Sequence, residues 1–399
     1  MREGEALASP GERPSASAGD GGTVDVLIVS LGSTAGLRVA DEELRASLCR
    51  AGASAALVRA RAPRRMRTLM LTDLAWALAA RRAARDALAL KDARALIYSS
   101  TTAALFWPRP GAIRFDAPAA ANRPGRHGLW QRPLERRRLR EAPLLLPLSE
   151  RGLLEAPVSA RAGEALVLPV PVEPPCEQGP RGGGRAVELD ATPSADAPVA
   201  AVPERDIAAL AYAGNPAKKG LDRILSAWAT ARKPGEELVV AGVGEEELHE
   251  LGYAVPAEGV RVVGMLPPHD YGALLARSRL FVCAARREDY GAAQLEALAK
   301  GCALVTIPSP GPYVALPIAR QLDGRLVSDD LARSLRTALD DPIPGYAAGA
   351  AQALAPFRRA AVDRLVAEQL LPRLLDAVSA IHETGRGGRR ISRSLFLTY

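Results

Sequence analysis

Several residue types and patterns are scarce in this chain, and each scarcity disfavours a class of protein. Aromatic residues make up only 4% of it. Proteins that bind single-stranded nucleic acid stack bases on aromatic side chains, so this class is disfavoured. No run of about 18 apolar residues occurs, so no segment is expected to span a bilayer as a helix. Residues 1–22 contain acids and small polar residues without an apolar stretch, which is not the pattern of a signal peptide.

Patterns typical of metal sites and disulfide frameworks are also missing. The four cysteines show no C-x-x-C spacing, so neither a zinc site nor a disulfide framework is predicted. The four histidines share no metal-ligand spacing with one another or with the cysteines. We therefore expect no metal cofactor and a cytoplasmic location. Peripheral attachment at the inner face of a membrane stays open.

What the chain does contain is typical of a folded globular protein. It has 399 residues, of which 48% are hydrophobic and 24% charged. This length suggests two domains or one large one. The formal net charge of +7 favours phosphates, anionic lipid or nucleic acid as partners, and charge alone does not choose among them.

Short apolar runs alternate with helical patterns in the first half of the chain. The run that begins at Val24 breaks at Gly32, and small residues follow as far as Gly36. Strands are predicted at 24–31, 53–61, 95–99, 112–115, 143–148 and 165–169, and helices at 41–53 and 72–90. Strands that alternate with helices predict a parallel sheet covered on both faces.

A stretch rich in proline and glycine separates this half from a second unit of similar pattern. The stretch cannot bury enough apolar surface to offset its ordering entropy, so residues 176–204 are predicted to be a linker. From Asp206 onward, strands and helices alternate again. The predicted fold class is α/β, with two doubly wound Rossmann-like domains and a ligand cleft between them at the carboxyl ends of the strands.

The stretch Glu288–Thr306 carries the strongest chemical signal. A second acid, Glu296, follows Glu288 by eight residues. If Gly291 ends a loop and a helix opens at Ala292, the first amides of that helix, near Ala292 and Ala293, can hold a phosphate. One acid can then meet a sugar and the other a ribose. The alternative is that both acids are solvated, one in a loop and one on a helix.

This stretch resembles the donor-binding domain of retaining GT-B glycosyltransferases of family 4 (glycosyl transferases group 1). The hallmark of that family is E-x7-E followed by A-x-A-x-G and an apolar strand. The matching residues here are Glu288, Glu296, Ala297, Ala299 and Gly301. The resemblance implies that Glu288 lies at the donor sugar and that Glu296 hydrogen-bonds the nucleotide ribose. It also implies that Tyr290 and Gly291, between the two acids, belong to the donor site.

The loop 214–222 resembles a second element of the family, its G-R-x(n)-K-G loop. In that family the arginine and the lysine neutralise the departing nucleotide diphosphate without a metal. Lys219 matches the lysine, whereas Asn215 stands where the arginine usually stands, and Lys218 can compensate for the missing cation. The alternative is a helix-entry loop with two solvated lysines.

Weaker parts of the resemblance concern the base, the first domain and the acceptor. Gly264 and Met265 match a turn that faces the nucleobase in relatives, and Gly32 and Gly36 lie in the first strand-to-helix turn, where backbone approaches the diphosphate. Asp116 ends a strand where many relatives carry a histidine that faces the donor sugar. It either contacts the sugar or orients an acceptor hydroxyl, or it caps the next segment.

Arginines cluster at 59–67 and at 123–140. A basic, amphipathic surface of this kind can dock on anionic lipid, so an acceptor carried on lipid or bearing phosphate would suit it. Solvated helix faces are the alternative.

The resemblance as a whole implies a retaining, metal-independent transfer of a hexose from a nucleotide sugar, UDP- or GDP-linked, to an unidentified acceptor. A sugar-nucleotide-binding homologue without transfer activity and a nucleic-acid-binding protein are the alternatives, and no nucleic-acid partner is expected.

The expected organisation follows from these assignments. It comprises a disordered leader at 1–23, an acceptor-binding domain at 24–175, the linker at 176–204, a donor-binding domain at 205–355, a C-terminal helix at 356–380 that crosses back to the first domain, and a basic tail at 381–399.

Overall fold

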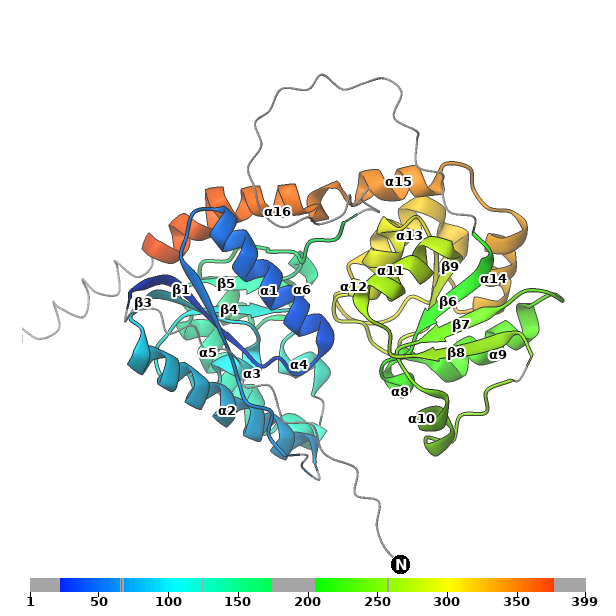
Figure 1. Cartoon of the computed structure of the whole chain (residues 1–399). Coiled ribbons are helices and arrows are strands. Elements are labelled where there is room, and N and C mark those ends of the chain that lie inside the picture. The colour runs from blue at the N-terminus through cyan, green and yellow to red at the C-terminus, as the bar shows by residue number, and fades with distance from the viewer. Residues whose placement is uncertain are drawn as a thin grey trace, which may run out of the picture.

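The computed structural model describes residues 22–64, 66, 68–123, 125–173, 205–256 and 258–376. The predicted linker and basic tail, and all but the last two residues of the predicted leader, lie outside these ranges. Figure 1 shows the chain as two α/β units side by side, joined along one edge by the helices near the C-terminus.

The first unit is built on a five-stranded parallel sheet with the order β2-β1-β3-β4-β5. Its strands are β1 (Val24–Ser30), β2 (Ala55–Arg59), β3 (Ala93–Tyr98), β4 (Ala112–Phe115) and β5 (Leu145–Pro147). Its helices are α1 (Ala35–Arg50), α2 (Leu69–Leu90), α3 (Thr101–Ala104), α4 (Ala119–Asn122), the 3-10 helix η1 (Gly125–Gly128), α5 (Gln131–Glu141), α6 (Glu150–Glu155) and α7 (Val158–Arg161). Separate apolar clusters cover the two faces of the sheet, as expected for a doubly wound unit.

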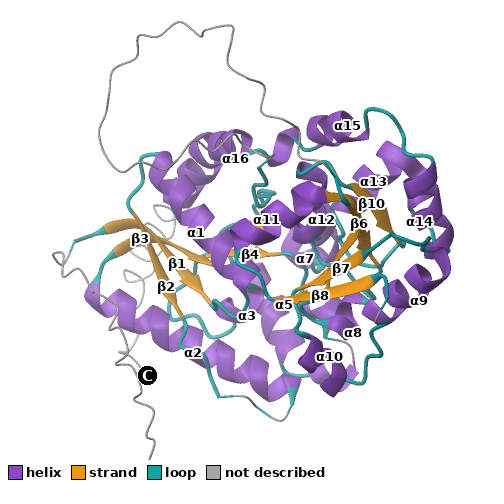
Figure 2. Cartoon of the chain, turned by 45° about the vertical axis from the view of Figure 1, so that its right-hand side comes forward, coloured by secondary structure: helices purple, strands orange, loops and turns teal. Residues whose placement is uncertain are grey.

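The second unit repeats this plan with the strand order β10-β9-β6-β7-β8, again all parallel (Figure 2). Its strands are β6 (Ile207–Tyr212), β7 (Leu238–Ala241), β8 (Val260–Gly264), β9 (Ser278–Cys283) and β10 (Ala303–Thr306). Its helices are α8 (Pro216–Lys219), α9 (Leu221–Ala231), α10 (Glu245–Glu250), α11 (Pro268–Arg277), α12 (Ala292–Ala299), α13 (Ala315–Asp323), the 3-10 helix η2 (Gly324–Leu326) and α14 (Leu331–Asp340). The two sheets together confirm the predicted α/β fold class.

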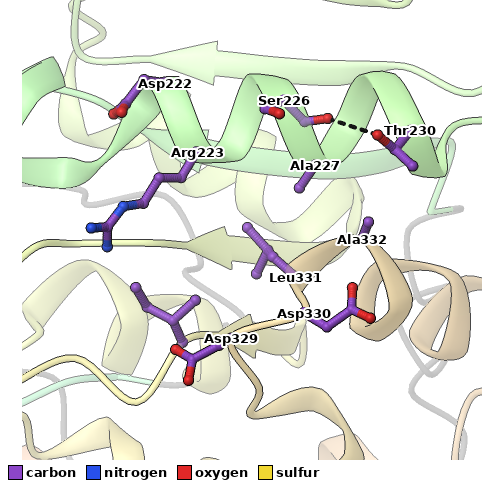
Figure 3. A pocket seen from close by; sticks show the side chains of 10 residues that line it. Asp222, Arg223, Ser226, Ala227, Thr230, Asp329, Asp330, Leu331 and Ala332 are labelled. Carbon is purple, nitrogen blue, oxygen red and sulfur yellow. Dashed lines mark hydrogen bonds between the residues drawn. The ribbon is translucent and has the colours of Figure 1, made fainter.

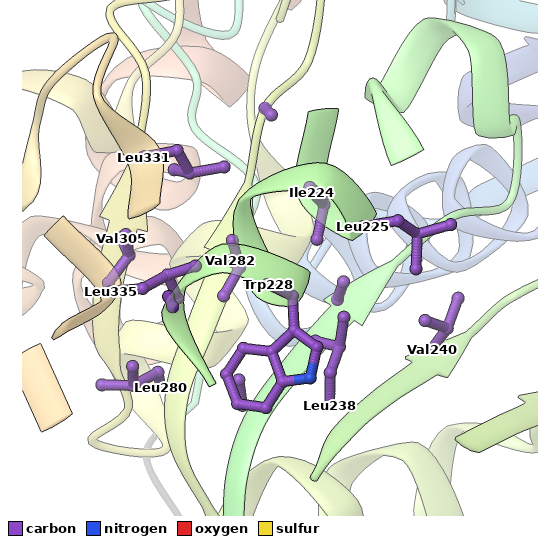
Figure 4. Packing of buried hydrophobic residues seen from close by; sticks show 14 of the residues in the cluster. Ile224, Leu225, Trp228, Leu238, Val240, Leu280, Val282, Val305, Leu331 and Leu335 are labelled. Carbon is purple, nitrogen blue, oxygen red and sulfur yellow. The ribbon is translucent and has the colours of Figure 1, made fainter. Parts of the chain in front are cut away.

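The core of the second unit is organised around Trp228 on α9. Ile224, Leu225 and Trp228 recur at helical spacing and are buried. Figure 4 shows the Trp228 indole above Leu238, among apolar side chains of the sheet and of α14. Its ring nitrogen donates a hydrogen bond of 2.7 Å to the carbonyl of Gly259, so the one polar atom of the indole is satisfied. This packing fixes α9, and with it the loop that precedes α9.

The chain then runs back to the first unit through α15 (Tyr346–Ala353), the 3-10 turn η3 (Ala355–Phe357), α16 (Arg359–Leu365) and the π-helical turn η4 (Val366–Leu370). Val362 and Val366 are buried against Leu44 and Leu48 of α1. Asp363 accepts hydrogen bonds from Arg50 at 2.6 Å and from Ser47 at 2.5 Å. Residues more than 300 positions apart thus hold the C-terminal helices on the first unit.

Two details differ from the sequence-based expectations. Helix α1 begins at Ala35 because Thr34 caps it by accepting from the Leu37 amide, so Gly36 lies inside the helix and not in the preceding turn. Residues 165–169 form a single parallel bridge, Leu145 with Ala165, and not the predicted strand. The amides of Leu166 and Leu168 still donate to β5, but Pro169 and Pro171 have no amide hydrogen with which to continue the ladder.

The turn between α8 and α9 requires glycine. Gly220 has a φ of 67°, and a β-carbon at this position would overlap the carbonyl oxygen of Ala284, which follows β9. We expect Gly220→Ala to lower the free energy of unfolding by about 2–4 kcal/mol, because left-handed strain and a backbone collision add together. Urea denaturation of the two proteins measures this loss.

Gly235→Ala is the matched control. Gly235 has a φ of 84°, but nothing lies within 4 Å of the position that a β-carbon would take there, so the substitution carries only the conformational cost of about 1 kcal/mol. Equal losses in the two variants would show that the approach of Ala284 is not what constrains Gly220.

Candidate functional site

A buried ion pair joins the loops that follow two neighbouring strands of the second sheet. The Lys219 ammonium, after β6, donates to Glu288 Oε2, after β9, at 2.6 Å. Only 21% of the lysine side chain and 7% of the glutamate side chain are exposed. The local sequence positions Lys219, because Asn215 caps α8 by accepting from the Lys218 amide and Gly220 ends α8 in the left-handed conformation.

Further contacts fix the protonation and orientation of this pair. Burial by itself lowers the pKa of Lys219, but the charge and hydrogen bond of Glu288 outweigh burial, so the pKa of the lysine is raised and the ammonium form is retained. The Gln294 side-chain amide donates to the same Glu288 oxygen at 3.1 Å and to the Cys283 sulfur at 2.9 Å. Gln294 is buried on α12 and was not predicted, because its sequence context marks it only as a residue of an apolar helix.

A second set of charges surrounds Asp289 and reaches the other domain. Asp289 accepts from Lys218 at 3.2 Å and from Arg287 at 2.7 Å. Arg287 also donates to Glu155, on α6 of the first domain, at 2.6 Å. A single guanidinium therefore connects the loop that carries Glu288 and Asp289 to the opposite domain.

Helix α12 begins directly after this loop. Gly291 adopts a left-handed conformation with a φ of 90°, and a β-carbon there would press on the Tyr313 ring. The first amides of α12, near Ala292 and Ala293, have no partners within the helix, as at any helix N-terminus, and Ala292 is exposed. These amides can bind an anion, as predicted from the sequence.

Glu296 lies one turn further along α12. Solvent reaches its side chain, yet the surrounding protein desolvates the carboxylate and raises its pKa to about 6, with Lys300 opposing that shift. Burial raises the pKa of Tyr271 well above its usual value, and the charge of Glu296 adds to this shift. The buried Tyr271 hydroxyl has no hydrogen-bond partner within the described ranges. The Glu296 carboxylate and the Tyr271 hydroxyl are therefore near enough to interact electrostatically.

Asp116 brings a carboxylate of the first domain to the same region. It follows β4 and is exposed, but protein on several sides desolvates it, and its pKa is raised by this effect and by the nearby charge of Asp289, while Lys218 lowers it. Its Oδ1 accepts from the Ala117 amide at 2.7 Å, so it also caps its own turn. We refer to Lys218, Lys219, Glu288, Asp289, Glu296 and Asp116 together as the interdomain site.

The sequence analysis missed a buried acid of the first domain that lies near Asp116. Both carboxylate oxygens of Glu135, on α5, accept from the Ala119 amide at the start of α4, at 2.8 and 3.0 Å. Glu135 is 3% exposed, and burial raises the pKa of its carboxyl group to about 7. Nearby, Arg123 forms two hydrogen bonds with Asp73 of α2. In the sequence, Glu135 stands in an arginine-rich helix and carries no signal that separates it from a solvated acid.

Other predicted site residues are placed differently. Tyr290 is buried, and its hydroxyl accepts from the Val170 amide at 2.9 Å, so it ties the end of the first domain to the site loop and does not point a polar group at a donor.

Met265, after β8, is 65% exposed and is free to meet a base. Gly264 has a φ of 73° and accepts from the Gly242 amide. Gly32 has a φ of 60° in the turn after β1, and open space surrounds the β-carbon position of Gly36.

The second domain also has a groove apart from this site. The groove encloses about 650 Å³ between α9 and α14. Figure 3 shows Asp222 and Arg223 on one wall and Asp329 and Asp330 on the other. None of the predicted site residues lines it, and Asp330 is already engaged as the cap of α14.

Comparison with known proteins shows a likeness in the second domain. Residues 206–341 match the family model described as glycosyl transferases group 1. This part of the chain is similar to that family. Lys219, Glu288 and Glu296 lie within the matched residues, whereas Asp116 and Glu135 lie outside them. No curated protein matches the sequence significantly.

Solved structures extend the likeness to the whole fold. Sucrose-phosphate synthase from Thermosynechococcus elongatus superposes with a TM-score of 0.56 at 15% identity, covering 94% of this chain and all of that one. HepE from Anabaena, solved with UDP and glucose, gives 0.58 at 13% identity, covering 88% and 99%. WaaG, a glycosyltransferase involved in lipopolysaccharide biosynthesis, gives 0.54 at 14% identity, covering 90% and 99%. The chain therefore has the GT-B fold, and the residues that match the family model lie in its second half.

The raised pKa of Glu135 predicts a pH-dependent stability. A carboxyl group whose pKa rises from 4.5 to about 7 on folding stabilises the protein below pH 4.5, and this contribution is lost as the pH rises through 7. We expect the stability of the wild type, relative to Glu135→Gln, to fall by roughly 2–3 kcal/mol between pH 4.5 and 8. Urea denaturation across this pH range measures the difference.

Glutamine keeps an oxygen that can accept from the Ala119 amide, so Glu135→Gln removes the ionisable group while it keeps the hydrogen bond. Glu150→Gln, at the start of the exposed helix α6, is the control and should show no comparable pH dependence. A constant difference between wild type and Glu135→Gln over the whole range would contradict burial of an ionising acid.

Proposed function

We propose that the protein is a glycosyltransferase that moves a sugar from a nucleotide-sugar donor to an acceptor with retention of anomeric configuration. The Lys219–Glu288 pair carries this proposal. It places a fixed cation and a fixed carboxylate side by side at the carboxyl ends of adjacent strands, within the residues that match the group 1 family model. In open parallel sheets, this edge is where ligands bind.

The arrangement suggests where each part of the donor lies. The diphosphate would lie between Lys219, Lys218 and the first amides of α12, which supply positive charge without a metal. Glu288 would face the sugar, and Glu296 would accept from the ribose hydroxyls. HepE has been solved with UDP and with UDP-glucose, which supports a uridine nucleotide in preference to a guanine one.

The chemistry requires little beyond positioning and charge stabilisation. The bond between the anomeric carbon and the diphosphate oxygen breaks, and the acceptor oxygen bonds to the same face of that carbon. The acceptor proton passes to the departing diphosphate, so no protein nucleophile is needed. Asp116, which the first domain presents opposite Lys218 and Asp289, would orient the acceptor hydroxyl.

A sugar-nucleotide-binding protein without transfer activity is the second candidate. The observation that favours it is that the Asn215 side chain caps α8. This neutral side chain cannot supply the positive charge that relatives place at the same position. Lys218, with 49% of its side chain exposed, is the cation closest in sequence that can replace it.

Calorimetric titration with UDP, GDP, ADP and dTDP, and with their sugar conjugates, tests donor binding. We expect saturable binding of the UDP series, weakened about tenfold or more by Glu296→Ala because one charged hydrogen bond to the ribose is lost. Glu258→Ala, which removes an exposed acid of the same domain, is the control. The absence of binding to every nucleotide by folded protein would end the proposal.

Release of UDP from a bound UDP-sugar, with and without candidate acceptors, separates the two candidates. We expect Lys219→Met to lower turnover by roughly 100-fold or more, because it removes a preorganised cation at the leaving group. Lys233→Met removes an exposed lysine of the same domain and should leave turnover unchanged. Tight donor binding without sugar transfer to any acceptor would favour the binding protein.

A further inference from the structure

The outer surface of α2 and the loop before it concentrate apolar and basic side chains. The described residues include twelve exposed large apolar side chains, and five of these belong to this short segment: Met66, Leu69, Leu71, Leu78 and Leu90. Figure 1 shows α2 along the outside of the first domain. Exposed apolar side chains that gather in this way mark an interaction surface, whereas scattered ones need no explanation.

Two of these side chains, Leu71 and Leu78, share a single stripe of the helix with two arginines. Asp73, Ala77, Ala80 and Ala84 are the buried face of α2. Leu71, Leu78, Arg82 and Arg85 follow one another at spacings of seven, four and three residues, so they line the opposite face. The stripe is apolar in its first half and cationic in its second. This order is typical of a helix that rests on a charged, partly apolar surface.

The charges around the stripe have one dominant sign. Arg61, Arg64, Arg81 and Lys91 are also exposed on this segment. The acids are fewer, since Asp73 is buried against Arg123 and Asp86 lies 3.7 Å from Arg82 at the surface. The surface therefore complements a negatively charged partner.

A groove adds a place for an apolar chain. It encloses about 820 Å³ between α2 and the edge strand β2, with Ala56, Val58, Leu78 and Ala83 among its walls. Its charged lining consists of four cations and one acid, namely Arg59, Arg61, Arg82, Lys91 and Asp86. Apolar walls with a mainly cationic charged lining match the amphipathic pattern of a lipid that carries an anionic headgroup.

The second arginine cluster, at 123–140, is more engaged in the fold. Arg123 is paired with Asp73, Arg132 donates to the carbonyls of Gly125 and Gly128, and Arg137 binds Glu141. Trp130 stacks on Phe106 with the ring centroids 5.9 Å apart. Arg126, Arg136 and Arg140 are exposed, but Leu129 is the one exposed large apolar side chain among the described residues of this segment, so the apolar stripe of α2 has no counterpart here.

We propose that Met66, Leu69, Leu71 and Leu78, together with Arg81, Arg82 and Arg85, dock the protein on the surface of a bilayer that contains anionic lipid. The leucines enter the headgroup boundary, and the arginines bind the headgroups. On the buried face of α2, Asp73 binds Arg123 at the end of α4, so the helix that carries this surface is tied to the segment that follows Asp116.

Sedimentation of the full chain with vesicles tests the docking surface. Vesicles of phosphatidylcholine, with and without phosphatidylglycerol, are compared at low and high salt. We expect binding only to the anionic vesicles, weakened by salt, since each cation near such a surface strengthens binding roughly fivefold. Arg82→Glu/Arg85→Glu should therefore lower the partition coefficient by about 25-fold or more. Leu71→Ser/Leu78→Ser should lower it by about tenfold or more.

Matched double variants on the second domain control for charge and hydropathy. Arg320→Glu/Arg333→Glu and Leu251→Ser/Ile343→Ser change exposed residues there and should bind vesicles like the wild type. No binding, equal binding to neutral vesicles, or a loss that the controls share would overturn the proposal.

Competition with duplex DNA tests nucleic acid as the alternative partner of this surface. DNA binding that depends on Arg82 and Arg85, while the leucine variant binds vesicles normally, would assign the surface to nucleic acid and overturn the proposal. Nucleotide titration of the same preparations reports the proposed function separately, because these variants leave the interdomain site intact. A failure of vesicle docking with normal UDP binding therefore refutes only the docking surface.

Discussion

The short ion pair between Lys219 and Glu288 is the interaction on which the rest of the site depends. Both residues are largely buried, so each charge is sustained by the other, and loss of one partner would leave an uncompensated charge. The pair also links the loops after β6 and β9, which are neighbouring strands. The positions of α8 and of the N-terminus of α12 are therefore coupled, and the helix amides and the lysine act on one small volume.

The first domain supplies a different kind of polar group. Asp116 and Glu135 both have raised pKa values, the former from partial enclosure and the nearby Asp289, the latter from burial. Glu135 holds the start of α4 through the Ala119 amide, three residues after Asp116. The first domain thus brings a carboxyl group near Asp289 of the second, where Lys218, which is paired with Asp289, partly offsets the repulsion.

Much of the fold follows from the sequence because alternating strands and helices restrict the topology. Short, mostly apolar runs such as 207–212 and 278–283 lie between helical patterns, and each is a strand. The predicted strand at 165–169 was wrong, because an apolar run in the sequence does not show that the prolines end its hydrogen bonding to the sheet. Short helices such as α3 and α4 were missed, since four residues cannot show a helical period.

The site was predictable where a motif fixes spacing and unpredictable where burial decides. Glu288, Glu296 and Lys219 stand out through their spacing from glycines and alanines, and the structure brings Glu288 and Lys219 into contact. Gln294 and Glu135 act through contacts with residues of neighbouring elements, and only the folded chain shows which polar residue of a helix is buried. The donor, acceptor and catalytic roles assigned to Lys219, Glu288, Glu296 and Asp116 remain predictions that the experiments above test.

The hydrogen bond between Tyr290 and Val170 links the geometry of the site to the movement of whole domains. Tyr290 stands two residues after Glu288, and Val170 lies where the chain is about to leave the first domain. Val170 and Val172 also pack against the core of the second domain. A rotation of one domain against the other must therefore either stretch this bond or bend the chain before Val170, so the contact confines such a bend to the residues between β5 and Val170.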